Sequence, residues 1–176
     1  MTNKLKLATA LGLSLCSSLV MADEAATLTK NMQEGMNKYC AAAVKGDHAS
    51  MHKLILSNFA PNCKFVGVDG KTMSLKEWMA AMDMNMKSMK SITKMKMTVG
   101  NVKVMGNKAT AKETFMMEGT MPNMKDPKKT SKMMVMGTST STYEKMGGKW
   151  MVVLSKDTSQ KMTIDGKPFD PSKMGG

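Results

Sequence analysis

The amino-acid sequence predicts an α+β domain in which helices pack on one face of a curved antiparallel sheet. In the first half of the chain apolar residues recur every three or four positions, which is typical of the buried face of a helix. In the second half they alternate with polar residues, which is typical of half-buried strands. The pair Gly106-Asn107 is a hairpin signal between two alternating segments, so the later strands should be consecutive and antiparallel.

Three helices and one short strand are predicted before the alternating region. The first helix runs from Glu24 to about Lys45, and the second runs from Asp47, its N-cap, to about Asn58. Phe59 to Asn62 reads as a turn, and Cys63 to Val68 reads as a short strand. Ser74 begins the third helix as its N-cap, and a glutamate three residues later completes a capping box.

Four long strands should follow the third helix, because the apolar period changes from helical to two beyond Ser91. A glycine-rich turn at 146–148 separates the last two strands, and a polar loop at 122–129 separates the middle two. The predicted strands lie at about residues 91–104, 108–121, 131–145 and 149–156.

The first 22 residues have the organisation of a cleavable signal peptide. Lys4 and Lys6 precede an apolar stretch from Leu11 to Val20, and compact residues then stand at the expected cleavage site, Ala22. The stretch is short for a membrane span, and Leu15 before Cys16 argues against lipidation. An uncleaved anchor is the alternative. We therefore expect a periplasmic or secreted protein with a signal peptide at 1–22, one domain at 23–160 and a loosely ordered tail at 161–176.

The charged residues argue against a nucleic-acid partner. All 26 basic residues are lysines, and the formal net charge is +12. Arginine is the preferred residue for bidentate contacts to phosphates and base edges, so its absence disfavours that class of partner. The lysines are also spread along every segment, which indicates a solvated basic surface.

Two cysteines, Cys40 and Cys63, remain after the signal peptide is removed. An even pair in an oxidising compartment predicts a disulfide, and two buried thiols are the alternative. Such a bond would contribute roughly 3 kcal/mol by the chain-entropy estimate.

Three stretches of the chain resemble the nuclear transport factor 2-like superfamily, which includes the SnoaL-like and ketosteroid isomerase-like domains. They are Tyr39–Asp47, Phe59–Phe65 and the helix start Ser74–Trp78, which follows Gly70. The resemblance extends over about residues 27–157. It implies a cone-shaped curved antiparallel sheet wrapped around three N-terminal helices, a conical pocket, and a homodimer formed through the backs of two sheets. Because many functions share this scaffold, the resemblance identifies the fold more strongly than the activity.

Ketosteroid isomerase chemistry is not expected. The family's pocket tyrosine is matched by Tyr39, but its two catalytic carboxylates align with Gly67 and with a position near Thr140. That reaction needs a base that takes the proton and a donor that stabilises the oxyanion. The resemblance therefore implies a non-enzymatic domain that binds a small apolar or amphipathic molecule.

The residues expected at such a pocket are aromatic or polar. Glu113 and Glu118 are an odd number of positions apart, so only one of them can face the pocket from an unbulged strand. An uncharacterised enzyme on the same scaffold is an alternative, and it would need one of these glutamates to face Tyr39. The predicted pocket residues are Tyr39, Trp78, Glu113, Phe115, Thr140 and Tyr143.

Methionine is unusually frequent, with 25 residues, and has two interpretations. Most of these side chains occupy apolar stripes, where methionine can replace leucine or isoleucine in a core. Met84, Met121 and Met124 do not fit such a stripe, and thioether sulfur suits Cu(I). No cofactor is expected unless these methionines bind copper. His48 and His52 have the spacing of two metal ligands on a helix, but surface histidines are the simpler interpretation.

Overall fold

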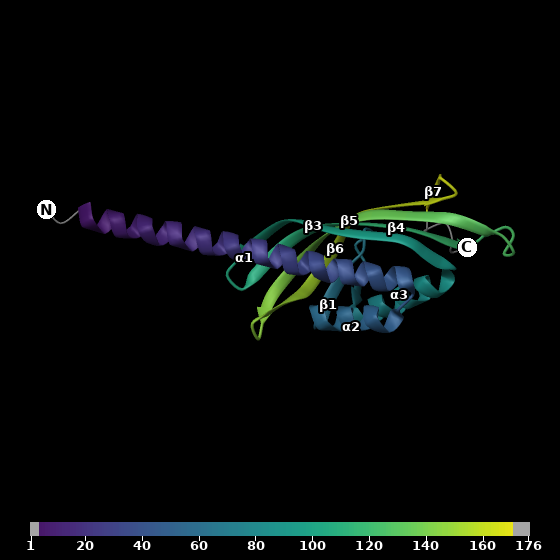
Figure 1. The fold of residues 1–176 in the computed structure, drawn as a ribbon, viewed down its shortest axis with the longest axis horizontal. Coiled ribbons are helices and arrows are strands. Elements are labelled where there is room, and N and C mark those ends of the chain that lie inside the picture. The colour runs from purple at the N-terminus through teal and green to yellow at the C-terminus, as the bar shows by residue number, and fades with distance from the viewer. Residues whose placement is uncertain (1–3, 171–176) are drawn as a thin grey trace.

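The computed structural model describes the backbone of residues 4–170 and the side chains of residues 23–170. The signal-peptide side chains, residues 1–22, therefore lie outside the described side chains, and residues 171–176 of the expected tail lie outside the structure altogether. Figure 1 shows three helices on one side of a curved sheet. The helices are α1 (Lys4–Lys45), α2 (His48–Asn58) and α3 (Leu75–Ser88), and the strands are β1 (Phe59–Val66), β2 (Thr72–Ser74), β3 (Ser91–Met105), β4 (Lys108–Pro122), β5 (Thr130–Met146), β6 (Lys149–Ile164) and β7 (Lys167–Phe169).

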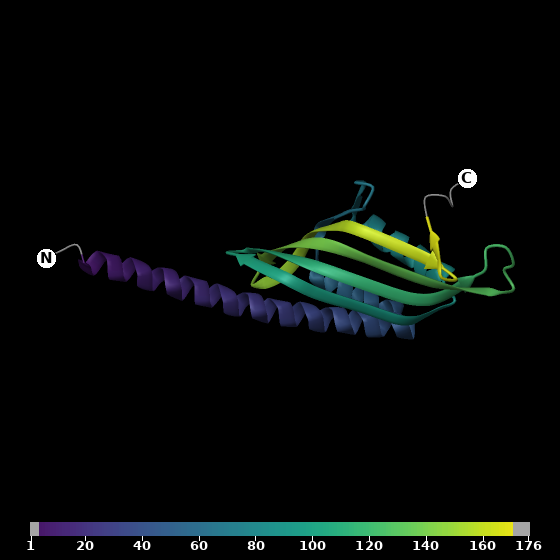
Figure 2. The same ribbon diagram turned by 90° about the horizontal axis from the view of Figure 1, so that it is seen from above.

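The sheet has the strand order β2-β1-β6-β5-β4-β3, and β7 pairs with β6. Strands β3 to β6 are long and antiparallel, as the turn signals predict, and α1 packs against β3 (Figure 2). The sheet is nevertheless mixed, because β1 pairs with β6 in parallel. The prediction of an α+β fold with a curved sheet around three helices is confirmed, and the four long strands are antiparallel as expected; the parallel pairing of β1 makes the whole sheet mixed.

The predicted helix starts at Asp47 and Ser74 are present. The Asp47 carboxylate accepts a hydrogen bond from the backbone N–H of Ser50 at 3.0 Å. At α3 the Ser74 hydroxyl accepts from the N–H of Glu77, and the Glu77 carboxylate accepts from the N–H of Ser74 at 2.8 Å. Each cap satisfies backbone donors that the first turn of a helix leaves without a partner.

Strand ends differ from the prediction in two places. Strand β1 begins at Phe59, because an irregularity between Phe59 and Lys64 lets the residues predicted as a turn remain within the strand. Strand β6 continues to Ile164, and Asp165 and Gly166 then form a turn with positive φ at both positions, as a type I′ hairpin requires. Residues 161–169 therefore belong to the sheet and are not a loosely ordered tail.

Two apolar clusters form the core. The larger lies between α1, β1 and the inner face of the sheet and contains Leu28, Phe65 and Tyr143. The smaller lies where α1, α2 and α3 meet β3 and β4, and it contains Met51 and Ile92. Among the described residues methionine rarely fills the core itself, since Met51 and Met133 are the fully buried ones. Most other methionines are half-buried, and many of them pack against the two core clusters.

The predicted disulfide is absent, because Cys40 and Cys63 are separate buried thiols. Cys40 lies on α1, where the backbone of Met97 on β3 contacts its thiol. Cys63 lies on β1 in the larger cluster, and burial raises the pKa of its thiol to about 11.

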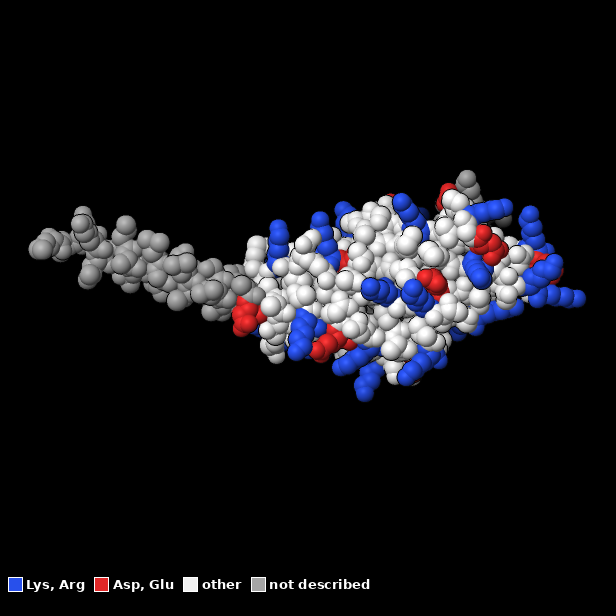
Figure 3. All heavy atoms as spheres, turned by 45° about the horizontal axis from the view of Figure 1, so that its top comes forward, with Lys and Arg blue, Asp and Glu red and all other residues white. Residues whose placement is uncertain are grey.

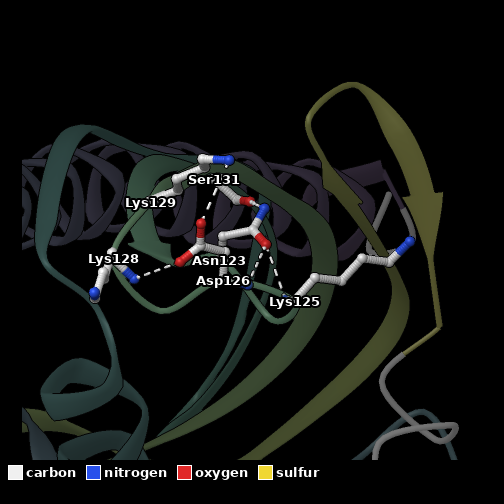
Figure 4. Close-up of polar contacts among 6 residues, drawn as sticks. All are labelled: Asn123, Lys125, Asp126, Lys128, Lys129 and Ser131. Atoms are coloured by element: carbon white, nitrogen blue, oxygen red, sulfur yellow. Dashed lines mark hydrogen bonds and ion pairs between the residues drawn. The ribbon is translucent and has the colours of Figure 1, made fainter.

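On the face drawn in Figure 3 the lysine side chains are spread out, and several gather at the end that carries the β4–β5 hairpin. The loop of this hairpin is held by Asn123, whose side-chain oxygen accepts from the N–H groups of Lys125 and Asp126 (Figure 4). Among the described residues, no helix is both long enough and apolar enough to cross a membrane.

Candidate functional site

A buried carboxylate lies on the inner face of the sheet, the face that the helices cover. Glu113 is on β4, and its Oε1 accepts a hydrogen bond from the hydroxyl of Tyr143 on β5 at 2.6 Å. Its Oε2 accepts from the hydroxyl of Ser139 at 3.3 Å. Ser141 brings a further hydroxyl to the same carboxylate. Glu113 and Tyr143 are only 8 % and 7 % exposed, so this is a polar cluster inside an otherwise apolar region.

The alternation of side chains along two neighbouring strands builds this cluster. Because successive strand residues face opposite sides, every second position of β4 and β5 faces inward. The register pairs Glu113 with Ser139, and Ser139 with Asp157 on β6, so three polar side chains cross the sheet at one level. Small inward residues surround them. The buried inward positions nearest the carboxylate include Ala109 and Ala111 on β4, and Ser139, Ser141 and Tyr143 on β5.

Burial dominates the electrostatics of the cluster. It raises the pKa of Glu113, although the hydroxyls of Tyr143, Ser141 and Ser139 act in the opposite direction by stabilising the carboxylate. Burial also raises the pKa of the half-buried Asp157. The pKa of Tyr143 is raised well above 10, first by burial and then by the nearby Glu113 carboxylate. The cluster can therefore accept hydrogen bonds from a ligand or exchange a proton with it.

Replacing Glu113 with glutamine is expected to flatten the dependence of stability on pH. A carboxyl whose pKa is raised in the folded state binds protons more tightly there than in the unfolded chain. Its contribution to the free energy of unfolding is therefore present at pH values below about 4.5, which is the ordinary pKa of glutamate. The contribution is lost as the pH rises through the raised pKa of the folded state. Urea denaturation across this range should show Glu113→Gln more stable than wild type only on the alkaline side.

Glu118→Gln is the matched control for this measurement, because Glu118 is on the same strand but pairs with Lys94 on the outer face at 3.7 Å. It should leave the pH profile unchanged. An unchanged profile in Glu113→Gln would show instead that the buried carboxyl titrates alike in the folded and unfolded chains.

Glu113 and Tyr143 are in direct contact, and the other predicted pocket residues have different neighbours. Tyr39 donates its hydroxyl hydrogen bond to the sulfur of Met82 at 3.1 Å. Trp78 stacks on Phe65, with ring centroids 4.3 Å apart. Phe115 faces inward, and its ring occupies the space where a side chain at Gly137 would lie. Thr140 lies on the outer face, and it lines a hollow of about 480 Å³ that Glu113 and Ser139 of the cluster also line.

The predicted metal residues lie on separate elements. Met84 is on α3 and is 72 % exposed, whereas Met121 lies near the end of β4 and Met124 lies in the β4–β5 loop. His52 contacts Asp83 on α3 at 2.7 Å rather than pairing with His48. Within residues 23–170, no group of three or more histidine, cysteine or acidic side chains is arranged to hold a metal ion.

Three residues of the polar cluster were missed by the sequence analysis, namely Ser139, Ser141 and Asp157. A signal for the serines exists in the run from Thr138 to Tyr143, where threonines alternate with smaller serines. Serine at positions that should face a core predicts a polar lining, since core positions are normally apolar. Asp157 could not be placed, because a bulge between Thr138 and Ser139 shifts its register.

Comparison with known proteins identifies similar families and folds. The model of the family described as "Putative lumazine-binding" matches residues 28–124. A crystal structure of a protein from Kribbella flavida is similar, with a TM-score of 0.58 and 16 % sequence identity over 77 % of this chain and 94 % of that one. No curated protein matches the sequence.

Two further structures carry the name of the superfamily. A nuclear transport factor 2-like superfamily protein from Salmonella enterica serovar Typhimurium has a TM-score of 0.51 and 18 % identity over 86 % of this chain and 98 % of that one. A nuclear transport factor 2-like protein of unknown function from Shewanella oneidensis has a TM-score of 0.50 and 16 % identity over 73 % and 97 %. The predicted resemblance to the nuclear transport factor 2-like superfamily is confirmed.

Proposed function

The chain belongs to the family described as "Putative lumazine-binding", and we propose that it binds a small apolar or amphipathic molecule on the inner face of its sheet without catalysing a reaction. The observation that carries this proposal is the buried Glu113 carboxylate held by Tyr143 at 2.6 Å. A buried carboxylate lowers stability unless it is compensated, so a functional role explains its presence better than packing does. Ligand sites typically combine an apolar lining with a few polar groups of this kind.

The lining of the inner face supports an apolar ligand. Met32, Met36, Met73 and Met79 are half-buried and pack against the larger core cluster. Methionine is unbranched and flexible, so it repacks around a bound molecule more easily than a branched side chain does. The family's description suggests a flat heterocycle such as lumazine, whose N–H groups could donate hydrogen bonds to the Glu113 carboxylate.

Lumazine binding by isothermal titration calorimetry tests this proposal. Wild-type protein should bind lumazine, and Glu113→Gln should bind it roughly 10- to 100-fold more weakly, because a hydrogen bond to a charged group contributes about 1.5–3 kcal/mol. Glu118→Gln on the outer face should bind as wild type does. Laurate serves as an amphipathic probe in the same titration.

Each outcome of the titration is informative. An equal loss of lumazine affinity in Glu113→Gln and Glu118→Gln would show that the ligand does not bind at the inner-face carboxylate. Failure of both lumazine and laurate to bind wild-type protein would contradict the proposal itself, provided that circular dichroism shows the protein to be folded.

The proposal includes export and pairing of two copies. Residues 1–22 carry the signal-peptide pattern, so protein from a periplasmic fraction or the medium should begin at Asp23, as intact mass can determine. The domain would then run from 23 to about 169. A homodimer through the outer faces of two sheets follows from the superfamily resemblance, and sedimentation velocity measures it directly.

A further inference from the structure

A hollow of about 420 Å³ lies between α1 and the edge strand β3, away from the Glu113 cluster. Three of its lining side chains carry sulfur, namely Cys40 from α1 and Met95 and Met97 from β3. Met95 and Met97 are two residues apart on one strand, so they share the face that is turned toward α1. The backbone of Met97 contacts the Cys40 thiol, which places the helix and the strand in direct contact here.

The position of α1 against this strand is fixed by Gln33. Its side-chain nitrogen donates to the carbonyl of Met97 at 2.9 Å, and its oxygen accepts from the N–H of Val99 at 3.1 Å. Both bonds join the strand to α1 about two helical turns before Cys40. The three sulfur-bearing side chains are therefore held by elements that do not slide relative to each other.

The sulfur atoms that line the hollow are soft metal ligands. One thiol and two thioethers are the ligands that Cu(I) selects over the harder divalent ions. Asn37 also lines the hollow, and the charged residues of the lining are Lys45 and Lys96. The lining contains no carboxylate or imidazole, which are the groups that zinc would prefer. A single thiolate neutralises Cu(I), whereas a divalent ion would retain a positive charge beside two lysines.

Met95 also connects the hollow to the smaller core cluster. It packs against that cluster, as Met82, Met86, Met89 and Met117 do.

We propose that this hollow binds one Cu(I) through the Sγ of Cys40 and the Sδ atoms of Met95 and Met97. On binding, the S–H bond of Cys40 is replaced by a Cu–S bond, and the proton passes to solvent. The copper enters and stays as Cu(I), so the step needs no oxidant or reductant. The site is distinct from the inner-face cluster and does not depend on the proposed ligand.

Competition with the Cu(I) chelator bicinchoninate, under anaerobic conditions, measures the affinity of purified protein for copper. Wild type should bind one Cu(I) and release one proton as it does so. The affinity of Cys40→Ser for Cu(I) should fall by more than roughly 100-fold. Substitutions of residues that contact only the ligands, and not the metal, usually lower affinity by about 10- to 100-fold. Met95→Leu with Met97→Leu should lose affinity in the same way while conserving core volume.

The control is the double variant Met84→Leu with Met124→Leu, because these are the exposed members of the three methionines, with Met121, that the sequence singles out for copper. This variant should bind Cu(I) as wild type does. X-ray absorption of the copper-loaded wild-type protein should show only sulfur atoms as neighbours of the copper. Retention of copper in both hollow variants, or loss in the control alone, would overturn the assignment. Circular dichroism of each variant separates loss of the site from loss of the fold.

Discussion

Replacing Gly119 with alanine is expected to lower the free energy of unfolding by about 3 kcal/mol. A β-carbon at this position would lie 2.4 Å from the backbone oxygen of Ser91 and 2.5 Å from the methyl group of Met89. The methionine can move, but the oxygen belongs to the neighbouring strand and can move only if the strand pairing shifts. For a domain of this size the melting temperature should fall by roughly 6–12 °C in a calorimetric scan.

Gly35→Ala is the matched control, and it should act in the opposite direction. A β-carbon at Gly35 would meet nothing within 4 Å, and the residue lies in the interior of α1. Alanine is favoured over glycine there by about 1 kcal/mol. Stabilisation by both substitutions would contradict the close approach of β3 to Gly119.

Met51→Ala should destabilise the protein by about 3 kcal/mol, a value typical of truncating a fully buried methionine. Met51 is 1 % exposed and lies in the smaller core cluster, so truncation leaves a cavity between α2 and its neighbours. Met51→Leu conserves the volume and should change stability by less than about 1.5 kcal/mol. Urea denaturation measures both variants.

Met84→Ala provides the contrast within the same residue type. Its side chain is 72 % exposed, so removing it should change stability by no more than about 0.5 kcal/mol. A similar loss at Met51 and Met84 would show that burial does not decide the contribution of methionine in this protein. The expected difference separates core methionines from those available to solvent.

The sequence was sufficient for elements with strong local signals. The capping box at Ser74 and the hairpin turn at Gly106 are short-range features, so they could be predicted without knowledge of packing. The parallel pairing of β1 with β6 could not, because it joins strands that are distant along the chain. The disulfide prediction between Cys40 and Cys63 failed for a similar reason, since only packing decides which way each thiol faces.

The candidate site was partly predictable from strand alternation. Glu113 and Glu118 had to face opposite sides, and the structure buries Glu113 and leaves Glu118 beside Lys94. The same alternation separates Tyr143 from Thr140, which are three positions apart on β5 and lie on opposite faces. What alternation could not reveal was the partner of each residue, because that depends on the register between strands and on their bulges.

The contact of Gln33 with β3 has a consequence for how copies of this protein behave at high concentration. Strand β3 is a long edge strand, and the unpaired backbone groups of an edge strand can form hydrogen bonds with a strand of another chain. Gln33 occupies the carbonyl of Met97 and the N–H of Val99, which are groups that an incoming strand would need. Helix α1 thus blocks the pairing of this strand with a strand of another copy. Gln33→Ala frees both backbone groups and should make the protein more prone to form fibrils.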